Sequence, residues 1–429
     1  LGTVDPGGEP TSVVVVGTRA YAGVNTSASF TEPSGKLVVI DIPQKEIVGE
    51  CDLGGQPDSV AVDANGSFIA VAIENERDED LGDGRVGQMP AGYLAMIDLA
   101  DNTAVCGSLK KVDLTGLAEV SPEDPEPEFV DINDNGDTVI TLQENNHLVI
   151  VNRAGEVVSH FSAGAVDLQN VDTDEESALT FDDTLEGVVR EPDAVKWIDN
   201  DHFATANEGD MDGGSRGWTI FNKDGSVVYD SNLSFEYAIA EIGHYPEKRS
   251  GNKGVEPESV FAATFGGTPM IFVGAERSSV VGVYEATNLA EPKLTQLLPS
   301  GVGPEGYVAI PSRNLLVSAN EADLIEDGGA RAHVMIYEYG EGAPAYPQLT
   351  SKGIRQENGA PLGWGAISGQ VADGKDTVWA VNDSFYGQQP TIFKIDVTSR
   401  PAKIIDYVRV TRAGFPAQKL DMEAVSYTH

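Results

Sequence analysis

The chain has 429 residues, of which 41 % are hydrophobic, and this proportion predicts a folded core rather than a disordered chain. Lys and Arg total 28 against 68 Asp and Glu, which gives a formal net charge of −40 at pH 7. A surface of this charge repels nucleic acid and anionic membranes, which excludes them as partners, whereas it suits divalent cations and high ionic strength. A marine or halophilic surface adaptation explains the same charge and is compatible with cation binding.

One pattern recurs seven times along the chain. Each copy begins with a short motif, roughly x-Pro-acid-small-apolar, that opens a predicted strand. A second β-rich run ending in an amide or an acid follows, then a third run and a fourth short strand. The opening motifs are GEPTSV at 8–13, GQPDSV at 55–60, PEPEFV at 125–130, REPDAV at 190–195, VEPESV at 255–260, a one-residue-shifted GPEGYV at 303–308 and a degenerate AISGQV at 366–371.

The spacing of these motifs predicts the fold class. Successive openings lie 47 to 70 residues apart, the length of a four-stranded β-sheet unit. One such unit cannot bury its own faces, so the units must pack around a common axis, and a closed ring removes exposed sheet edges. The sequence therefore predicts an all-β protein: a single seven-bladed β-propeller of four-stranded antiparallel blades over residues 1–429. LDMEAVSY at 420–427 either closes the ring, giving eight blades, or begins a second propeller.

Acidic side chains occupy two equivalent positions of the repeat. The first strand of a blade starts, and the second ends, on the same face, so both sets of acids should meet at one channel mouth. Calcium takes six to eight oxygen ligands with loose geometry, which suits acids from several blades better than magnesium would; zinc is disfavoured because the six histidines are scattered. Alternatively, each acid caps a turn. The second set includes Glu74, Glu144 and Asp383, and the predicted calcium ligands are Asp58, Glu128, Asp193, Glu208, Asp210, Glu258, Glu276, Glu305 and Glu321.

Basic residues are few, so their positions are informative. Arg249 and Lys253 precede the fifth opening motif and Arg277 follows Glu276, while Arg216 and Arg331 end two similar loops. Converging on the acidic face, these side chains could grip a phosphate or a carboxylate. The alternative is ion pairing with neighbouring acids.

Two cysteines occur, Cys51 and Cys106, both in the predicted fourth strand of adjacent blades. This equivalence permits a disulfide, which would indicate an extracellular compartment. No apolar run approaches the ~20 residues that a membrane-spanning helix needs.

The chain resembles a known family as well. The segments HFATANEGD, KRSGNKGVEPESV and GPEGYVAIPSRNLLVSANEAD are similar to the secreted bacterial choice-of-anchor I domain, a resemblance that covers nearly the whole chain. From about Gly363, SGQVADGKDTVWAVNDS resembles the start of the phytase-like esterase β-propeller family, so that 363–429 would form a final, truncated blade. The resemblance implies a secreted or cell-surface propeller with metal-dependent phosphoester chemistry. The residues to which the resemblance assigns this chemistry are Glu208, Asp210, Arg249, Lys253, Glu258, Glu276, Arg277, Glu305 and Glu321.

Two functions are consistent with these observations. The first is a secreted calcium-binding protein that acts as an extracellular or cell-surface scaffold. The second is a calcium-dependent phosphoester hydrolase, phytase-like or alkaline-phosphatase-like, in which Arg249 or Lys253 steadies the transition state. A phosphorylated small molecule or a surface polymer is the expected partner. No G-x-S-x-G elbow or P-loop is present, so serine esterase and P-loop chemistry lack support.

Overall fold

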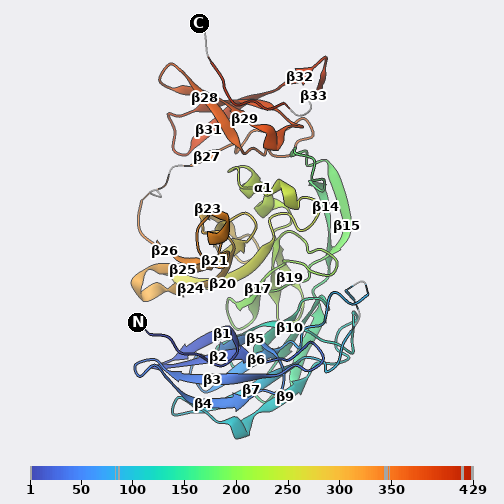
Figure 1. Cartoon of the computed structure of the whole chain (residues 1–429), viewed down its shortest axis with the longest axis vertical. Helices are drawn as coiled ribbons and strands as arrows, with labels where there is room; N and C mark the ends of the chain where they lie inside the picture. The colour runs from blue at the N-terminus through green and yellow to red at the C-terminus, as the bar shows by residue number, and fades with distance from the viewer. Residues whose placement is uncertain are drawn as a thin grey trace.

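The computed structural model describes residues 2–82, 84–85, 87–342, 346, 348–416 and 420–426. Within these ranges almost every element is a β-strand, which confirms the all-β prediction. The strands form seven sheets of three to five strands in chain order, together with two two-stranded sheets (Figure 1). We number the seven larger sheets 1 to 7.

The first three sheets keep their strands in sequence order, except that the outer edge of sheet 2 is split between two strands. Sheet 1 contains β1 (Glu9–Val16), β2 (Arg19–Asn25), β3 (Gly35–Asp41) and β4 (Glu46–Asp52). Sheet 2 contains β5 (Pro57–Val62), β6 (Phe68–Ile73), β7 (Tyr93–Ala100), β8 (Thr103–Ala104) and β9 (Lys110–Asp113). Sheet 3 contains β10 (Pro127–Ile132), β11 (Thr138–Leu142), β12 (His147–Val151) and β13 (Val157–Ser162).

The next four sheets repeat this arrangement, with three described strands in sheet 6. Sheet 4 contains β16 (Val195–Trp197), β17 (His202–Ala206), β18 (Trp218–Asn222) and β19 (Val227–Asp230). Sheet 5 contains β20 (Pro257–Phe265), β21 (Thr268–Ala275), β22 (Val280–Glu285) and β23 (Lys293–Pro299). Sheet 6 contains β24 (Pro304–Ile310), β25 (Leu315–Asn320) and β26 (His333–Glu338). Sheet 7 contains β27 (Leu349–Thr350), β28 (Ile367–Asp373), β29 (Thr377–Asn382), β30 (Thr391–Asp396) and β31 (Ala402–Arg409).

Short elements that the repeat does not predict connect these sheets. A hairpin of β14 (Ala165–Val171) and β15 (Asp183–Val189) separates sheets 3 and 4, and α1 (Ser234–Ala240) separates sheets 4 and 5. Apolar side chains of β14 pack beside Leu233, just before α1. The remaining short elements are η1 (Cys106–Ser108), η2 (Glu247–Arg249), η3 (Pro311–Arg313), η4 (Ile325–Asp327), η5 (Ser384–Tyr386), β32 (Thr411–Arg412) and β33 (Phe415–Pro416).

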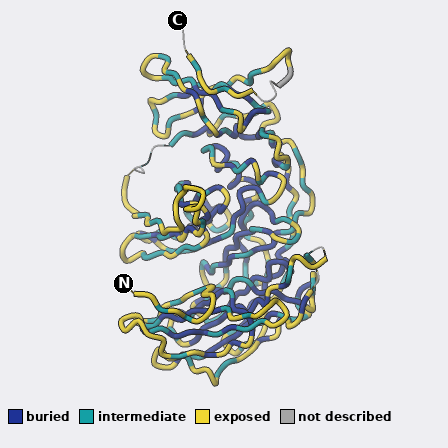
Figure 2. The backbone as a smooth tube through the Cα atoms, in the orientation of Figure 1, coloured by how far each residue is buried: buried dark blue, intermediate teal, exposed yellow. Residues whose placement is uncertain are grey.

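Sheets 1 to 6 pack face to face in chain order. Their inner strands β1, β5, β10, β16, β20 and β24 are successive neighbours in space. A separate apolar cluster fills each interface, because alternate residues of every strand point to opposite faces. The buried segments accordingly run through most strands of sheets 2 to 5. At the ends of the array β1 is largely exposed and β24 partly exposed, as are the turns and outer edges (Figure 2).

The two ends of this six-sheet array have uncovered faces. The valine three positions after the motif proline points toward the preceding sheet, and Val60, Val130, Val195 and Val260 are at most 6 % exposed there. Their equivalent in sheet 1, Val13, is 61 % exposed because no described sheet covers that side.

The last sheet of the array shows the same contrast on its opposite side. Val281 and Val283 of β22 are buried by sheet 6, with exposures of 0 % and 5 %. The equivalent residues of β26, Val334 and Ile336, are 61 % and 64 % exposed. The array therefore has an open apolar face at each end.

Sheet 7 packs elsewhere and lies at the opposite end of the molecule from sheet 1 (Figure 1). Trp364 Nε1 donates to the Glu241 carbonyl at 3.0 Å, and Asn358 Nδ2 donates to the Thr180 carbonyl at 3.0 Å. A Cβ on Gly369 of β28 would lie 2.9 Å from Ala424, so the segment that resembles an eighth opening motif runs beside β28. This position differs from a closed ring in which sheet 7 adjoins sheet 1. The assignment of 363–429 as a final blade remains a prediction, and residues 427–429 lie outside the described ranges.

Candidate metal centre

A β-bulge follows the motif proline in several sheets and positions the acid beside it. Proline has no N–H to donate, so it fits the first residue of a strand, where it stands in β5, β10, β20 and β24. The register then shifts, and Glu258 and Glu305 have no cross-strand partner. Because a bulge re-aims the side chain of its extra residue, the motif itself directs these carboxylates away from the sheet face.

Two groups of three carboxylates result, and both contain residues of the two predicted acidic sets. The first group is Asp58, Glu74 and Glu128, from sheets 2 and 3. The second is Asp193, Glu208 and Glu258, from sheets 4 and 5. Within each group one oxygen of every carboxylate lies within 4.8 Å of the others. Oxygen ligands at this spacing can surround one hard cation such as calcium.

The two groups lie close enough to act on each other and on sheet 6. Burial raises the pKa of Asp58 to about 7, and Glu305 of sheet 6 adds to that rise. Burial also raises the pKa of Asp193 well above its usual value, with contributions from Glu208 and then Asp58. Acids of sheets 2, 4 and 6 therefore lie close enough for their charges to repel one another.

Several of these carboxylates strongly favour the protonated state in the apoprotein. Burial raises the pKa of Glu258 to about 11, and repulsion from Glu208 and Glu276 adds to the rise. Burial, followed by repulsion from neighbouring acids, raises the pKa of Glu74 and Glu128 well above the usual range. Glu258 Oε2 is buried and accepts no hydrogen bond within the described residues. A bound cation would offset this repulsion, because it replaces the missing positive charge.

The two groups differ in their basic partners. Lys253 Nζ lies 2.9 Å from Glu208 Oε1, and Gln143 Nε2 lies 2.8 Å from Glu208 Oε2. In the described part of the chain, no Lys or Arg makes an ion pair with Asp58, Glu74 or Glu128. The first group is therefore the less compensated of the two.

The other predicted ligands lie near the centre without joining either group of three. Burial raises the pKa of Glu305 to about 7, and repulsion from Glu321 adds to the rise. Glu276 is paired with Arg277 at 2.9 Å. Asp210 contributes to the raised pKa of Glu144, which is about 8 mainly through burial.

Asp383 does not take the predicted place. Its carboxylate accepts a hydrogen bond from the Phe385 backbone N–H at 2.8 Å and caps η5. The expectation that it joins the acidic centre is therefore wrong, because sheet 7 lies apart from the array and its loops serve local turns. For this residue the turn-capping alternative is correct.

Arg249, Lys253 and Arg277 converge as predicted, but on a residue that the sequence analysis missed. Glu256, the residue before the motif proline, is buried, and its Oε2 accepts from Arg249 Nη2 at 2.7 Å and from Arg277 Nε at 3.2 Å. Lys253 Nζ lies 3.7 Å from its Oε1. The ion-pairing alternative therefore holds for these three side chains, which nevertheless stand beside the second carboxylate group.

Equivalent glutamates before the proline hold other loops around the centre. Glu191 accepts backbone N–H groups of Asp210, at 2.7 Å, and Asp212, at 2.8 Å. Glu126 pairs with the buried Arg77 at 3.1 Å. The signal was present in the sequence, since Glu-Pro recurs in four opening motifs. It was missed because the functional role was assigned to the acid after the proline and not to the glutamate before it.

Arg216 and Arg331 do not reach the centre. Arg216 is buried, donates from Nη1 to the Asp172 carbonyl at 2.9 Å, and lies 3.6 Å from Glu236. Arg331 is exposed and lies 3.6 Å from Asp323. Neither fits the predicted role of gripping an anion at the acidic face.

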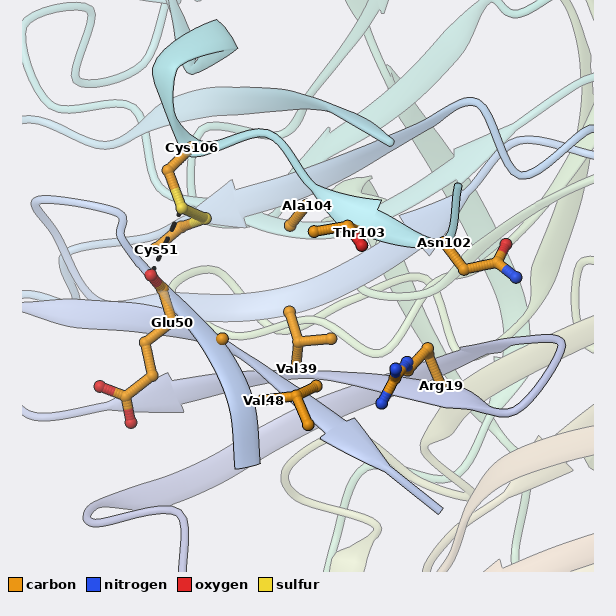
Figure 3. A pocket seen from close by; sticks show the side chains of 10 residues that line it. Arg19, Val39, Val48, Glu50, Cys51, Asn102, Thr103, Ala104 and Cys106 are labelled. Carbon is orange, nitrogen blue, oxygen red and sulfur yellow. Dashed lines mark hydrogen bonds between the residues drawn. A yellow bond between two sulfur atoms is a disulfide. The ribbon is translucent and has the colours of Figure 1, made fainter. Parts of the chain in front are cut away.

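Cys51 and Cys106 form a disulfide, as the sequence permits, with a Cα–Cα separation of 5.2 Å. Cys51 lies in β4, whereas Cys106 lies in η1 and not in the predicted fourth strand. The bond joins the outer edges of sheets 1 and 2 beside a small pocket of about 160 Å³, into which Val39 and Val48 point (Figure 3). Among the described residues we find no helix long and apolar enough to cross a membrane.

Several solved structures are similar to this chain. The WD40 repeats of RRP9 match with 10 % identity and a TM-score of 0.42, over 77 % of this chain and 94 % of that one. A protein from Lactobacillus plantarum matches with 13 % identity and a TM-score of 0.45, over 79 % of this chain and 90 % of that one. No curated protein shows a significant sequence match to this chain.

The sequence model of the choice-of-anchor I domain matches residues 2–213 and 211–289. This stretch contains sheets 1 to 4, most of sheet 5 and both carboxylate groups. The match spans 288 of 429 residues, and the chain therefore belongs to the choice-of-anchor I domain family.

Proposed function

We propose that this protein is a secreted, surface-associated β-propeller that binds calcium at its carboxylate centre and acts as a binding or scaffold protein. The observation that carries this proposal is the meeting of Asp58, Glu74 and Glu128 within 4.8 Å, with no described basic side chain paired to them. Membership of the choice-of-anchor I family and the disulfide support an extracellular location of the protein.

Calcium is expected to occupy the first group before the second. The second group already has Lys253 on Glu208, and a cation there must displace that ammonium or accept its repulsion. When bound, calcium would supply positive charge that holds the loops of sheets 2 and 3 together. The chain's own bulges and prolines set the positions of the oxygens beforehand, which lowers the ordering cost of binding.

Isothermal titration of the chelator-treated protein with calcium tests this proposal. We expect saturable binding that Glu128→Gln weakens at least tenfold, because the substitution removes one charged ligand from the first group. Glu186→Gln is the matched control, since Glu186 lies exposed on β15. Calcium binding that is unchanged in Glu128→Gln would overturn the proposal.

A calcium-dependent phosphoester hydrolase is the second candidate, favoured by Arg249 and Arg277 beside the second carboxylate group. These guanidinium groups could orient a phosphate, and bound calcium would supply charge neutralisation. Turnover of p-nitrophenyl phosphate with calcium, lost in Arg277→Gln and with chelator, would support it. The absence of calcium-dependent turnover would leave the scaffold function.

We further propose that the complete ring has seven blades. The open faces of sheets 1 and 6 carry the apolar positions that bury neighbouring sheets elsewhere in the array, with Val13 and Ile336 at their centres. A further four-stranded sheet with apolar side chains on both of its faces would fit between the open faces of sheets 1 and 6. Hydrogen exchange of β1 and β26 tests this closure, since strands covered in solution exchange slowly.

A further inference from the structure

A second polar cavity lies far from the carboxylate centre, between sheet 7 and the segment before β15. Its volume is about 580 Å³, which is within the range of small-molecule sites. It lies where sheet 7 packs against residues 179–182, outside both carboxylate groups. The lining residues are Thr180, Asp182, Gln356, Glu357, Asn358, Gln389, Tyr407 and Arg409.

The positive charge of this cavity is the guanidinium of Arg409, which is paired with neutral acceptors alone. Its Nη2 donates to Gln356 Oε1 at 3.1 Å and its Nη1 donates to Thr391 Oγ1. The guanidinium carbon lies 5.1 Å from the centre of the Tyr407 ring. No carboxylate of the described residues is in ion-pair contact with Arg409. Arg409 is half-buried, and a partly desolvated charge without a counterion is costly, so this group is suited to receive an anion.

The walls of the cavity are held in place by side-chain amides. Gln356 Nε2 donates to the Leu179 carbonyl at 3.0 Å and to the Pro361 carbonyl at 3.1 Å. Asn358 Nδ2 donates to the Phe181 carbonyl at 3.0 Å. Because these bonds fix the walls of the cavity, its occupation requires little ordering of the protein.

Two exposed acids, Asp182 and Glu357, line the same cavity. Their charges oppose entry of a dianion such as a phosphate monoester, whereas their oxygens can accept hydrogen bonds from hydroxyl groups. One half-buried cation and two acceptor side chains therefore fit a monoanion that carries several hydroxyl groups. The ring of Tyr407 offers an apolar surface beside the charge.

We propose that this cavity binds an acidic sugar, with the sugar carboxylate on Arg409 and its hydroxyl groups on Asp182 and Glu357. The site is independent of the calcium centre, since it lies on sheet 7 and uses none of the residues of the two carboxylate groups. A uronic acid unit of an extracellular polysaccharide has this chemistry.

Saturation-transfer NMR and calorimetric titration with D-glucuronate, D-glucose and D-glucose 6-phosphate test the proposal. We expect glucuronate to bind with a millimolar or lower Kd, and glucose and the sugar phosphate at least tenfold more weakly. Arg409→Gln should lose glucuronate binding, whereas Arg412→Gln, on the exposed β32, should retain it. Absence of glucuronate binding to the wild-type protein, or equal binding of the phosphate, would overturn the proposal.

Two further variants keep the test decisive if Arg409→Gln does not fold. Arg409→Lys keeps the charge but loses the planar pair of donors, so we expect intermediate affinity. Asp182→Lys replaces a rim acid with a cation and should improve binding of the sugar phosphate at least tenfold. If neither variant changes the ligand preference, the cavity does not use these groups and the proposal is wrong.

Discussion

The interior and the ends of the six-sheet array contain the same repeat in two different environments. Between sheets, the motif valines and Val281 and Val283 of β22 are almost fully buried, whereas their equivalents Val13, Val334 and Ile336 are more than half exposed. The sequence is apolar at these positions in both places. The comparison shows that a repeat unit carries apolar side chains on both of its faces. The arrangement of the sheets decides whether a neighbouring sheet covers each face.

The largest expected effect comes from emptying an interior interface. Phe272, in β21, is buried between sheets 5 and 6, where Val281 and Val283 also pack. Phe272→Ala should lower the free energy of unfolding by about 3–5 kcal/mol, since it removes buried surface and leaves a cavity. Urea denaturation followed by tryptophan fluorescence measures this loss. A cost below about 1 kcal/mol would contradict the tight packing of this interface.

The disulfide should contribute nearly as much, because it ties the end sheet to its neighbour. Cys51 and Cys106 close a loop of 55 residues, for which chain entropy gives a stabilisation of about 4 kcal/mol. The Cys51→Ser/Cys106→Ser double variant should therefore unfold at markedly lower urea concentration. Faster exchange of the sheet 1 amides, compared with those of sheet 4, would show that the loss is local. Equal loosening of both sheets would contradict this assignment.

Calcium should stabilise the protein by about 3 kcal/mol at a hundred times its Kd. The size of this effect depends on pH. The acids of the centre have pKa values raised by burial and mutual repulsion, for example to about 7 in Asp58 and Glu305, so the folded apoprotein binds more protons than the unfolded chain above about pH 4. Stability without calcium should therefore fall as pH rises from about 5 to about 8.

Thermal unfolding in chelator and in calcium, at about pH 5 and at about pH 8, measures how the stabilisation by calcium depends on pH. The stabilisation by calcium should be larger at the higher pH, because fewer protons compete for the carboxylates. Magnesium at equal concentration is the control, since it dehydrates reluctantly and needs stricter geometry. A chelated protein that is more stable at the higher pH would contradict the raised pKa values.

The smallest expected effect lies on the open face. As long as no further sheet covers this face, Ile336→Ala and Val334→Ala should each change the free energy of unfolding by about 0.5 kcal/mol or less, because both side chains are then exposed to water. Val281→Ala, at an equivalent buried position, is the matched control and should cost about 2 kcal/mol. If Ile336→Ala costs as much as the control, a further sheet covers this face in solution.

The local features of the repeat were readable from the chain. Pro-acid openings predicted strand starts, and the acids beside Pro57 and Pro127 lie in one carboxylate group while the acid beside Pro257 lies in the other. The sequence also permitted the disulfide, although Cys106 lies in η1 and not in the predicted fourth strand. These features were predictable because proline, β-branched runs and turn residues act over a few residues, where sequence and geometry are directly linked.

Features that depend on contacts between distant segments could not be predicted in this way. The sequence did not indicate that Glu256 would collect Arg249 and Arg277, because their convergence needs two sheets to be placed first. The one sign in the sequence that sheet 7 differs is that its opening motif, AISGQV, lacks both the proline and the acid, but this did not indicate that the sheet would pack against the segment around Leu179. The amino-acid sequence by itself determined the strands, the repeat and the positions of the acids. Which faces found neighbours, and which charges met, was decided only by the tertiary structure, because burial and electrostatic repulsion depend on residues far apart in the chain.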